Sequence, residues 1–140
     1  MSRIFWDTNL FIYLFEGSAE LGGKVAALRE KMLRRGDQLV TSALTLGEVL
    51  VKPMKEGDTK LLKEYSEVIP AVAVMLPFDE KAATVYARLR GDAGMRAPDA
   101  IQLACAAAFG VDLFVTNDAR LHNQQVAGIQ FIIPLERVPI

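Results

Sequence analysis

Short apolar runs alternate with longer segments of mixed polarity along this chain of 140 residues. The short runs suit buried strands, whereas the longer segments place apolar residues at the 3.6-residue spacing of helices. Strands are expected at residues 3–6, 38–41, 71–76, 113–115 and 129–133. Helices are expected at residues 8–15, 25–36, 43–51, 59–69, 80–89 and 98–109. This alternation predicts an α/β fold in which helices cover both faces of a mainly parallel sheet, giving three layers, α/β/α.

Glycine and proline mark several of the expected boundaries. Gly17, Gly22 and Gly23 are predicted to form the turn before the second helix, and Pro53 and Pro70 to end the helices before them. The chain contains no repeat, no low-complexity tract and no long linker. Residues 1–140 are therefore expected to form a single domain.

Composition and charge narrow the class of protein. Apolar residues make up 51% of the chain, which is enough for a substantial core, and the formal net charge is −1. Such a charge argues against a protein that coats nucleic acid through a broad basic surface. It does not argue against a nuclease, because bound divalent cations make an acidic pocket attractive to phosphate.

The cysteine content and the N-terminal sequence address redox state and location. Cys105 is the only cysteine, so an internal disulfide is excluded, and its alanine neighbours predict a packed thiol. No signal peptide is apparent, and the apolar run at residues 10–15 is too short to span a bilayer. A cytoplasmic protein without membrane contact is therefore expected.

Four acidic residues stand beside apolar runs. Asp7 and Asp118 follow predicted strands, Glu48 interrupts an apolar helix, and Asp99 begins another. An ionised carboxylate next to apolar surface is costly unless a partner, often a metal ion, compensates its charge. Because ligands of parallel sheets bind beyond the carboxyl ends of the strands, Asp7 and Asp118 are expected at one crevice.

Each acid also has a purely structural interpretation. Asp7 can cap the helix that follows it, and Asp118 can cap the next turn. Glu48 can pair with Lys52 on the helix surface, and Asp99 complements the dipole of its helix. Any one of these explanations is adequate for a single residue. The occurrence of four such acids in one short chain favours a shared site.

The ordered motifs resemble those of PIN-domain ribonucleases, and more narrowly the VapC-type toxins of bacterial and archaeal toxin–antitoxin pairs. The motifs are Asp-Thr-Asn at residues 7–9, Glu48, Ala-Pro-Asp-Ala at 97–100, and Thr-Asn-Asp at 116–118. The likeness covers essentially the whole chain. It implies a divalent-metal-dependent endoribonuclease that cuts RNA, with a small antitoxin as partner and a homodimer as the usual state.

The resemblance also implies roles for individual residues. The acidic, metal-binding pocket is formed by Asp7, Glu48, Asp99 and Asp118. Thr116 is implied as a catalytic-site residue that positions a metal-bound water or a ligand carboxylate, and Asn9 as a support behind the metal ligands. A further acid that some members carry beyond the fourth is missing, because residues 121–123 are Leu-His-Asn.

The chemistry of the four acids points to the same type of cofactor. Carboxylates without histidine or cysteine suit Mg²⁺ or Mn²⁺ better than zinc, and such cations activate water and stabilise the oxygens of a phosphodiester under attack. His122, the only histidine, lies in a polar stretch and is expected at the surface. For binding the RNA backbone, Arg96 is the first candidate and Lys52 follows, together with Lys55 and Arg120.

Three other hypotheses about function compete with a nuclease. A phosphatase of the haloacid-dehalogenase type needs a second acid two residues after the first, where this chain has Asn9. A receiver-like signalling domain needs paired acids after the first strand and a late lysine, and neither is found in the sequence. A PIN-like module that binds RNA or a protein without cutting remains open.

Overall fold

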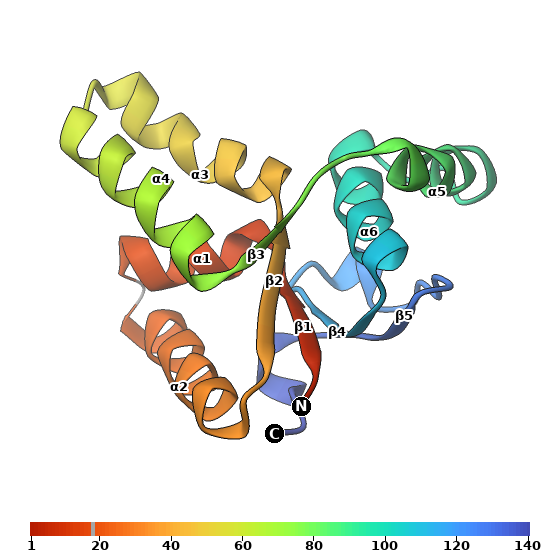
Figure 1. The fold of residues 1–140 in the computed structure, drawn as a ribbon, viewed down its shortest axis with the longest axis horizontal. Coiled ribbons are helices and arrows are strands. Elements are labelled where there is room, and N and C mark those ends of the chain that lie inside the picture. Colours follow the sequence, from red (N-terminus) through yellow and green to blue (C-terminus); the bar gives the residue numbers. More distant parts are fainter. Residues whose placement is uncertain (18) are drawn as a thin grey trace.

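A sheet of five parallel strands lies at the centre of the computed structural model, which describes residues 1–17 and 19–140 (Figure 1). The strands are β1 (Arg3–Trp6), β2 (Gln38–Ser42), β3 (Val74–Leu76), β4 (Val111–Val115) and β5 (Ile129–Ile133). Their order across the sheet is β3-β2-β1-β4-β5, and every neighbouring pair is parallel. All carboxyl ends therefore meet at one edge of the sheet.

Helices cover both faces of this sheet, so the predicted three-layer architecture is confirmed. The helices are α1 (Thr8–Glu16), α2 (Ala19–Arg35), α3 (Ala43–Glu56), α4 (Thr59–Val72), α5 (Glu80–Asp92) and α6 (Ala97–Phe109). Two short 3₁₀ turns follow, η1 (Ala119–Leu121) and η2 (Leu135–Arg137). Helices α1–α4 lie on one side and α5 and α6 on the other (Figure 1). Among the described residues, no helix combines the length and apolarity needed to cross a membrane.

Successive side chains of β1 point to opposite faces of the sheet and contribute to a hydrophobic core on each face. Ile4 and Trp6 pack toward α1–α4, whereas Phe5 packs toward α5 and α6. Phe5 stacks on Phe114 of the neighbouring strand β4, with 4.7 Å between ring centroids. Because β1 is buried on both faces, its register relative to β4 is strongly determined. That register sets where the strand ends carrying Asp7 and Thr116 meet.

Two prolines do not end the helices that contain them. Pro53 lies inside α3 and Pro70 inside α4, and α3 continues to Gly57, whose φ of 67° provides the left-handed cap. Each proline costs one helical hydrogen bond, but α3 and α4 pack against each other as a hairpin and bury apolar side chains in return. The strand predicted at 71–76 is accordingly shortened to β3, because α4 extends to Val72.

Two glycines predicted to lie in a turn are instead part of α2, which begins at Ala19. Gly22 is needed there because a Cβ at this position would lie 2.7 Å from the carbonyl oxygen of Tyr13 in α1. Gly23, one residue later, has nothing within 4 Å of the corresponding point. The close approach of α1 and α2 therefore depends on one glycine of the pair.

We expect opposite effects from alanine at these two adjacent positions. Gly23→Ala should stabilise the protein by up to about 1 kcal/mol, because alanine is the better helix former. Gly22→Ala should destabilise it by roughly 1–3 kcal/mol, because the new methyl group meets backbone that must move. Urea unfolding followed by circular dichroism measures both free energies. Equal effects of the two substitutions would contradict the close contact between α1 and α2.

Candidate active site

The four predicted acids line one pocket, of about 550 Å³, at the carboxyl edge of the sheet. Asp7 follows β1, Asp118 follows β4, Glu48 projects from α3, and Asp99 lies in the first turn of α6. The pocket is also lined by Thr8, Asn9, Ile12, Val51, Arg96, Pro98, Gln102 and Arg120. Strands β1 and β4 are direct neighbours, so the two strand-end acids come together through sheet topology.

Asp7 is held by neutral hydrogen-bond donors. Its Oδ1 accepts from the backbone N–H of Thr8 at 2.8 Å, and its Oδ2 accepts from the hydroxyl of Thr116 at 2.7 Å. Burial raises the pKa of Asp7 above its ordinary value, although these two hydrogen bonds act to lower it. The nearby carboxylates of Glu48 and Asp99 raise this pKa further. A cation bound beside Asp7 would offset the cost of ionising it.

Glu48 is exposed, but its carboxylate is fixed by a buried polar network. Its Oε1 accepts a 2.6 Å hydrogen bond from the hydroxyl of Thr8, a residue that is 7% exposed. Gln102 donates from Nε2 to Thr45 at 2.7 Å and to Thr8 at 3.2 Å. The hydroxyl of Ser42 in turn donates to Oε1 of Gln102. Glu48 is thus oriented by groups from β2, α1, α3 and α6.

The sequence offered only part of the signal for this network. Gln102 is the one polar residue in the apolar segment 100–109, but the sequence does not indicate its partners. Ser42 and Thr45 were readable as polar residues around the start of an apolar helix, with Ser42 accepting from the Thr45 N–H as an N-cap. Their link to Gln102 depends on the packing of α3 against α6, which no local pattern reports.

The other two acids are paired with arginine. Nε of Arg96 donates to Asp99 at 3.1 Å, and its NH2 group lies 3.9 Å from Oδ2 of Asp118. Arg120 contacts both oxygens of Asp118, from Nε at 2.9 Å and from NH2 at 2.5 Å. The side-chain hydrogen bonds of Arg120 are the main reason why the pKa of Asp118 lies below its ordinary value. Asp118 and Asp99 are therefore electrostatically compensated, unlike Asp7.

Thr116 joins the acids of the two central strands. Its buried hydroxyl donates to Asp7 and accepts from the backbone N–H of Asp118 at 3.1 Å. Nε2 of His122 lies 2.7 Å from the carbonyl oxygen of Thr116 and must donate, because a carbonyl only accepts. The predicted surface role of His122 is therefore incorrect. The ring is half-buried and holds the turn that follows β4.

The remaining candidates divide between the pocket and its surroundings. Asn9 is exposed and lines the pocket, as do Arg96 and Arg120. Lys52 lies outside the lining and pairs with Glu16 of α1 at 3.7 Å. The alternative pairing of Lys52 with Glu48 is thus replaced by a contact with α1. The structural interpretations of three acids hold alongside the shared pocket, because Asp7 caps α1, Asp118 caps η1, and Asp99 lies in the first turn of α6.

The charge and donor chemistry of this pocket suit a hard cation. Four carboxylates and two guanidinium groups leave the lining with a formal charge of −2. Its acidic donors are carboxylate oxygens, which Mg²⁺ and Mn²⁺ prefer. Over residues 1–17 and 19–140, no three Asp, Glu, His or Cys side chains converge closely enough to form a preassembled ion cage. The carboxylates of Asp7, Glu48, Asp99 and Asp118 are the groups of this pocket that could hold such a cation.

Comparison with known proteins identifies the family of this chain. The chain matches the PIN domain family over residues 4–126. It is 31% identical over 120 residues to Ribonuclease VapC23 of Mycobacterium tuberculosis (strain CDC 1551 / Oshkosh), covering 84% of this chain and 94% of that protein.

Solved structures of toxin–antitoxin proteins share the fold. VapBC2 from Rickettsia felis, bound to a DNA fragment from its promoter, superposes with a TM-score of 0.74 at 15% identity over 94% of this chain and 96% of that one. DNA-bound VapBC from Salmonella typhimurium superposes with a TM-score of 0.68 at 20% identity, over 96% and 99%. At these identities the superpositions establish the fold.

The chain belongs to the PIN domain family and, within it, to the VapC-type ribonucleases.

Replacing Asp7 by asparagine should raise the melting temperature by a few degrees at neutral pH without added metal. The pKa of Asp7 is raised in the folded protein above its ordinary value of 3.8. The folded state therefore loses stability as the pH rises from 3.8 through the pKa of the folded protein, where Asp7 becomes ionised. The difference between Asp7→Asn and wild type should therefore be small in acid and grow toward neutral pH. Calorimetry across that range, with exposed Asp92→Asn as control, measures it. A variant less stable than wild type at neutral pH would contradict the uncompensated charge.

Proposed function

We propose that this protein is a divalent-metal-dependent endoribonuclease that hydrolyses RNA phosphodiester bonds, and that it is the toxin of a toxin–antitoxin pair. The observation that carries the proposal is the meeting of four carboxylates, from β1, α3, α6 and the end of β4, in one pocket. Membership of the VapC-type ribonucleases supports the same activity. All four acids, Asp7, Glu48, Asp99 and Asp118, are proposed to hold Mg²⁺ or Mn²⁺.

A bound divalent cation would lower the pKa of a water molecule and neutralise charge on the phosphate that is cut. The chain's own residues are proposed to orient the reacting groups. Thr116 fixes the carboxylate of Asp7 through its hydroxyl, and Thr8 fixes that of Glu48. Gln102 acts one contact further away, because it donates to Thr8 from the buried side. Asn9 is proposed to support the acids from the exposed first turn of α1.

Arg96 and Arg120 are proposed to contact the RNA backbone. Both side chains are about three-fifths exposed, at 60% and 59%, and both line the acidic pocket. A guanidinium group matches the geometry of a phosphate, so these residues can exchange a carboxylate partner for substrate. Lys52 is proposed as a more distant backbone contact, because its exposed side chain lies on α3 outside the pocket.

A small antitoxin is the proposed protein partner. The similar structures from Rickettsia felis and Salmonella typhimurium are VapBC complexes, and another is a toxin–antitoxin complex from Klebsiella pneumoniae. Exposed apolar side chains on α3 and α4 offer a surface for such a partner, namely Val51, Met54, Val68 and Val72. Val51 also lines the acidic pocket, so a partner on this surface would reach the pocket rim. A homodimer and a single domain over residues 1–140 are proposed from the same relationship.

One observation favours a second candidate, a module that binds RNA without cutting it. Arg96 and Arg120 already compensate two of the four carboxylates, as expected of a site built for binding alone. The uncompensated charge of Asp7 favours the metal-dependent enzyme instead. Cleavage assays distinguish the two.

Purified protein should cleave a mixed pool of single-stranded RNA when Mg²⁺ or Mn²⁺ is present, and a chelator should abolish cleavage. Asp7→Asn and Asp99→Asn should each lower the rate by at least about a hundredfold, because each removes a proposed metal ligand. Asp92→Asn, on exposed α5, serves as the matched control. If both pocket variants retained full activity, a contaminating nuclease would be the better explanation. Metal binding without cleavage of any RNA would favour the non-catalytic module.

Metal binding can be followed independently through Trp6, the only tryptophan. Trp6 is 1% exposed, packs against Phe11 and directly precedes Asp7, so its fluorescence should change when the neighbouring carboxylate binds a cation. Titration with Mn²⁺ should give a saturable change in wild type. The midpoint should weaken at least about tenfold in Asp7→Asn, the result of losing one charged ligand. An unchanged midpoint would exclude Asp7 as a ligand.

A further inference from the structure

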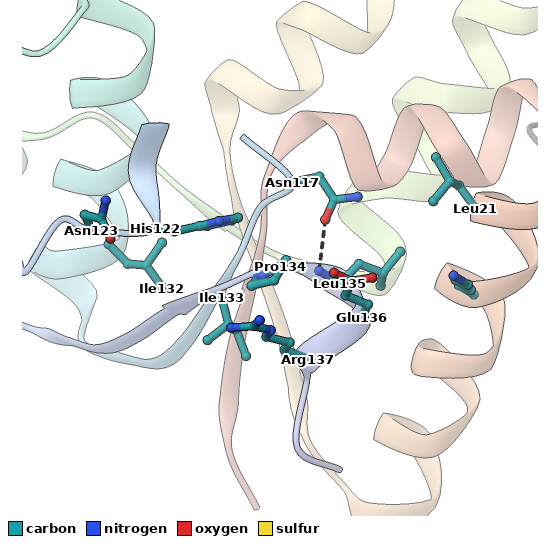
Figure 2. A pocket seen from close by; sticks show the side chains of 11 residues that line it. Leu21, Asn117, His122, Asn123, Ile132, Ile133, Pro134, Leu135, Glu136 and Arg137 are labelled. Atoms are coloured by element: carbon teal, nitrogen blue, oxygen red, sulfur yellow. Dashed lines mark hydrogen bonds between the residues drawn. The ribbon is translucent and has the colours of Figure 1, made fainter. Parts of the chain in front are cut away.

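A second pocket lies on the same edge of the sheet as the acidic pocket. It has a volume of about 560 Å³, within the range of small-molecule sites, and lies between the ends of β4 and β5 and the helix α2 (Figure 2). Asn117 lines this pocket, whereas Asp118, the next residue, lines the acidic one. The turn after β4 therefore separates two adjacent pockets, and we call the second one the basic side pocket.

The basic side pocket has the opposite charge to its neighbour. Lys24 of α2 and Arg137 of η2 line it, together with one acid, Glu136, which gives a formal charge of +1 with neutral histidine. Lys24 makes only a long, exposed contact with Glu20 at 3.6 Å. Arg137 has no ion pair within residues 1–17 and 19–140. An anion can therefore be held here without a metal ion.

Neutral groups in the same pocket can recognise a base. Because Nε2 of His122 donates to Thr116, Nδ1 of the neutral ring is left as an acceptor. The side-chain oxygen Oδ1 of Asn117 accepts from the backbone N–H of Leu135 at 2.9 Å (Figure 2), which leaves the side-chain nitrogen Nδ2 as a donor. Asn123 is exposed at the rim and adds a second amide.

Apolar surface completes the pocket. Ile132 and Ile133, at the end of β5, are half-buried and line it (Figure 2), with Ile132 packed toward α5 and α6 and Ile133 toward α1–α4. Such surface suits the face of a base or a ribose. The pocket combines cations for a phosphate, hydrogen-bonding groups for the edge of a base, and apolar side chains. This combination suits a nucleotide better than an acidic peptide, which carries negative charge but no base.

We propose that the basic side pocket binds a nucleotide of the RNA strand next to the scissile phosphate, with Arg137 on a backbone phosphate and Lys24 adding positive charge to the same pocket. This inference rests on the proposed ribonuclease function and locates a second site at which that enzyme binds its RNA substrate. Without a bound cation the acidic pocket has a formal charge of −2 and repels a phosphate, so cationic contacts beside it would help a strand to approach. The basic side pocket provides them one residue away along the chain. Asn117, Asn123 and His122 contact the base and favour particular sequences.

Binding of uncut RNA tests the proposal. Fluorescence anisotropy should be recorded for a labelled, mixed-sequence single-stranded RNA with the Asp7→Asn protein in Mg²⁺. Adding Arg137→Gln to this protein should weaken binding about tenfold and lower the salt slope of the affinity by about 0.7, the value for one phosphate contact on a single strand. Arg34→Gln is the matched control, because Arg34 is exposed on α2, pairs with Glu30 and lies outside the pocket. Equal weakening by both substitutions, or by neither, would overturn the proposal.

A second measurement separates this inference from the ribonuclease function. Nuclear magnetic resonance of the wild-type protein with each of the four nucleoside 5′-monophosphates should perturb the amides of Asn117 and Asn123 and the ring of His122. Arg137→Gln should abolish the perturbation. RNA cleavage without any perturbation would overturn the side pocket and leave the enzyme intact, whereas perturbation without cleavage would keep the nucleotide site and reject the enzyme. Perturbation by a Glu-rich peptide but by no nucleotide would assign the pocket to a protein partner, and would also overturn the proposal.

Discussion

A carboxylate held by neutral donors at the end of a buried strand is the constraint on which the rest of this site depends. Asp7 sits where β1 leaves the sheet, with one hydrogen bond from Thr8 and one from Thr116. Burial and the neighbouring acids raise its pKa, so the protein itself does not compensate its negative charge. Ionising such a partly buried carboxylate costs folding free energy, and a cation bound in the pocket would offset that cost.

The parallel sheet explains how this carboxylate acquires its neighbours. Since β1 and β4 are adjacent and parallel, their carboxyl ends emerge together, and Thr116 bridges Asp7 to the turn that contains Asp118. Glu48 lies on the other side of β1. Its carboxylate accepts a hydrogen bond from Thr8, and Gln102 donates in turn to Thr8. The polar network is buried and hydrogen-bonded, which makes the direction of each carboxylate specific.

Two pockets of opposite charge lie side by side at the carboxyl ends of the strands. The acidic pocket lies over β1 and β4, and the basic side pocket lies over β4 and β5, with the turn at 116–118 between them. His122 stabilises that turn through the carbonyl of Thr116 and faces the second pocket, so it connects the two structurally. The chain has a net charge of −1, but it places cations locally along this edge, where the proposed RNA substrate would lie, at Arg96, Arg120, Lys24 and Arg137.

Local periodicity and sheet topology are enough to predict the order of strands and helices, the parallel sheet and the acids at strand ends. Local rules were wrong where packing outweighed them: Pro53 and Pro70 stay inside helices, and Gly22 lies within α2 against Tyr13. Which acids are compensated depends on contacts between elements that are distant in sequence. The bond from Thr116 to Asp7 joins residues 109 apart in sequence, and that from Gln102 to Thr8 spans 94. No periodicity encodes such contacts, since they exist only once separate elements have packed together.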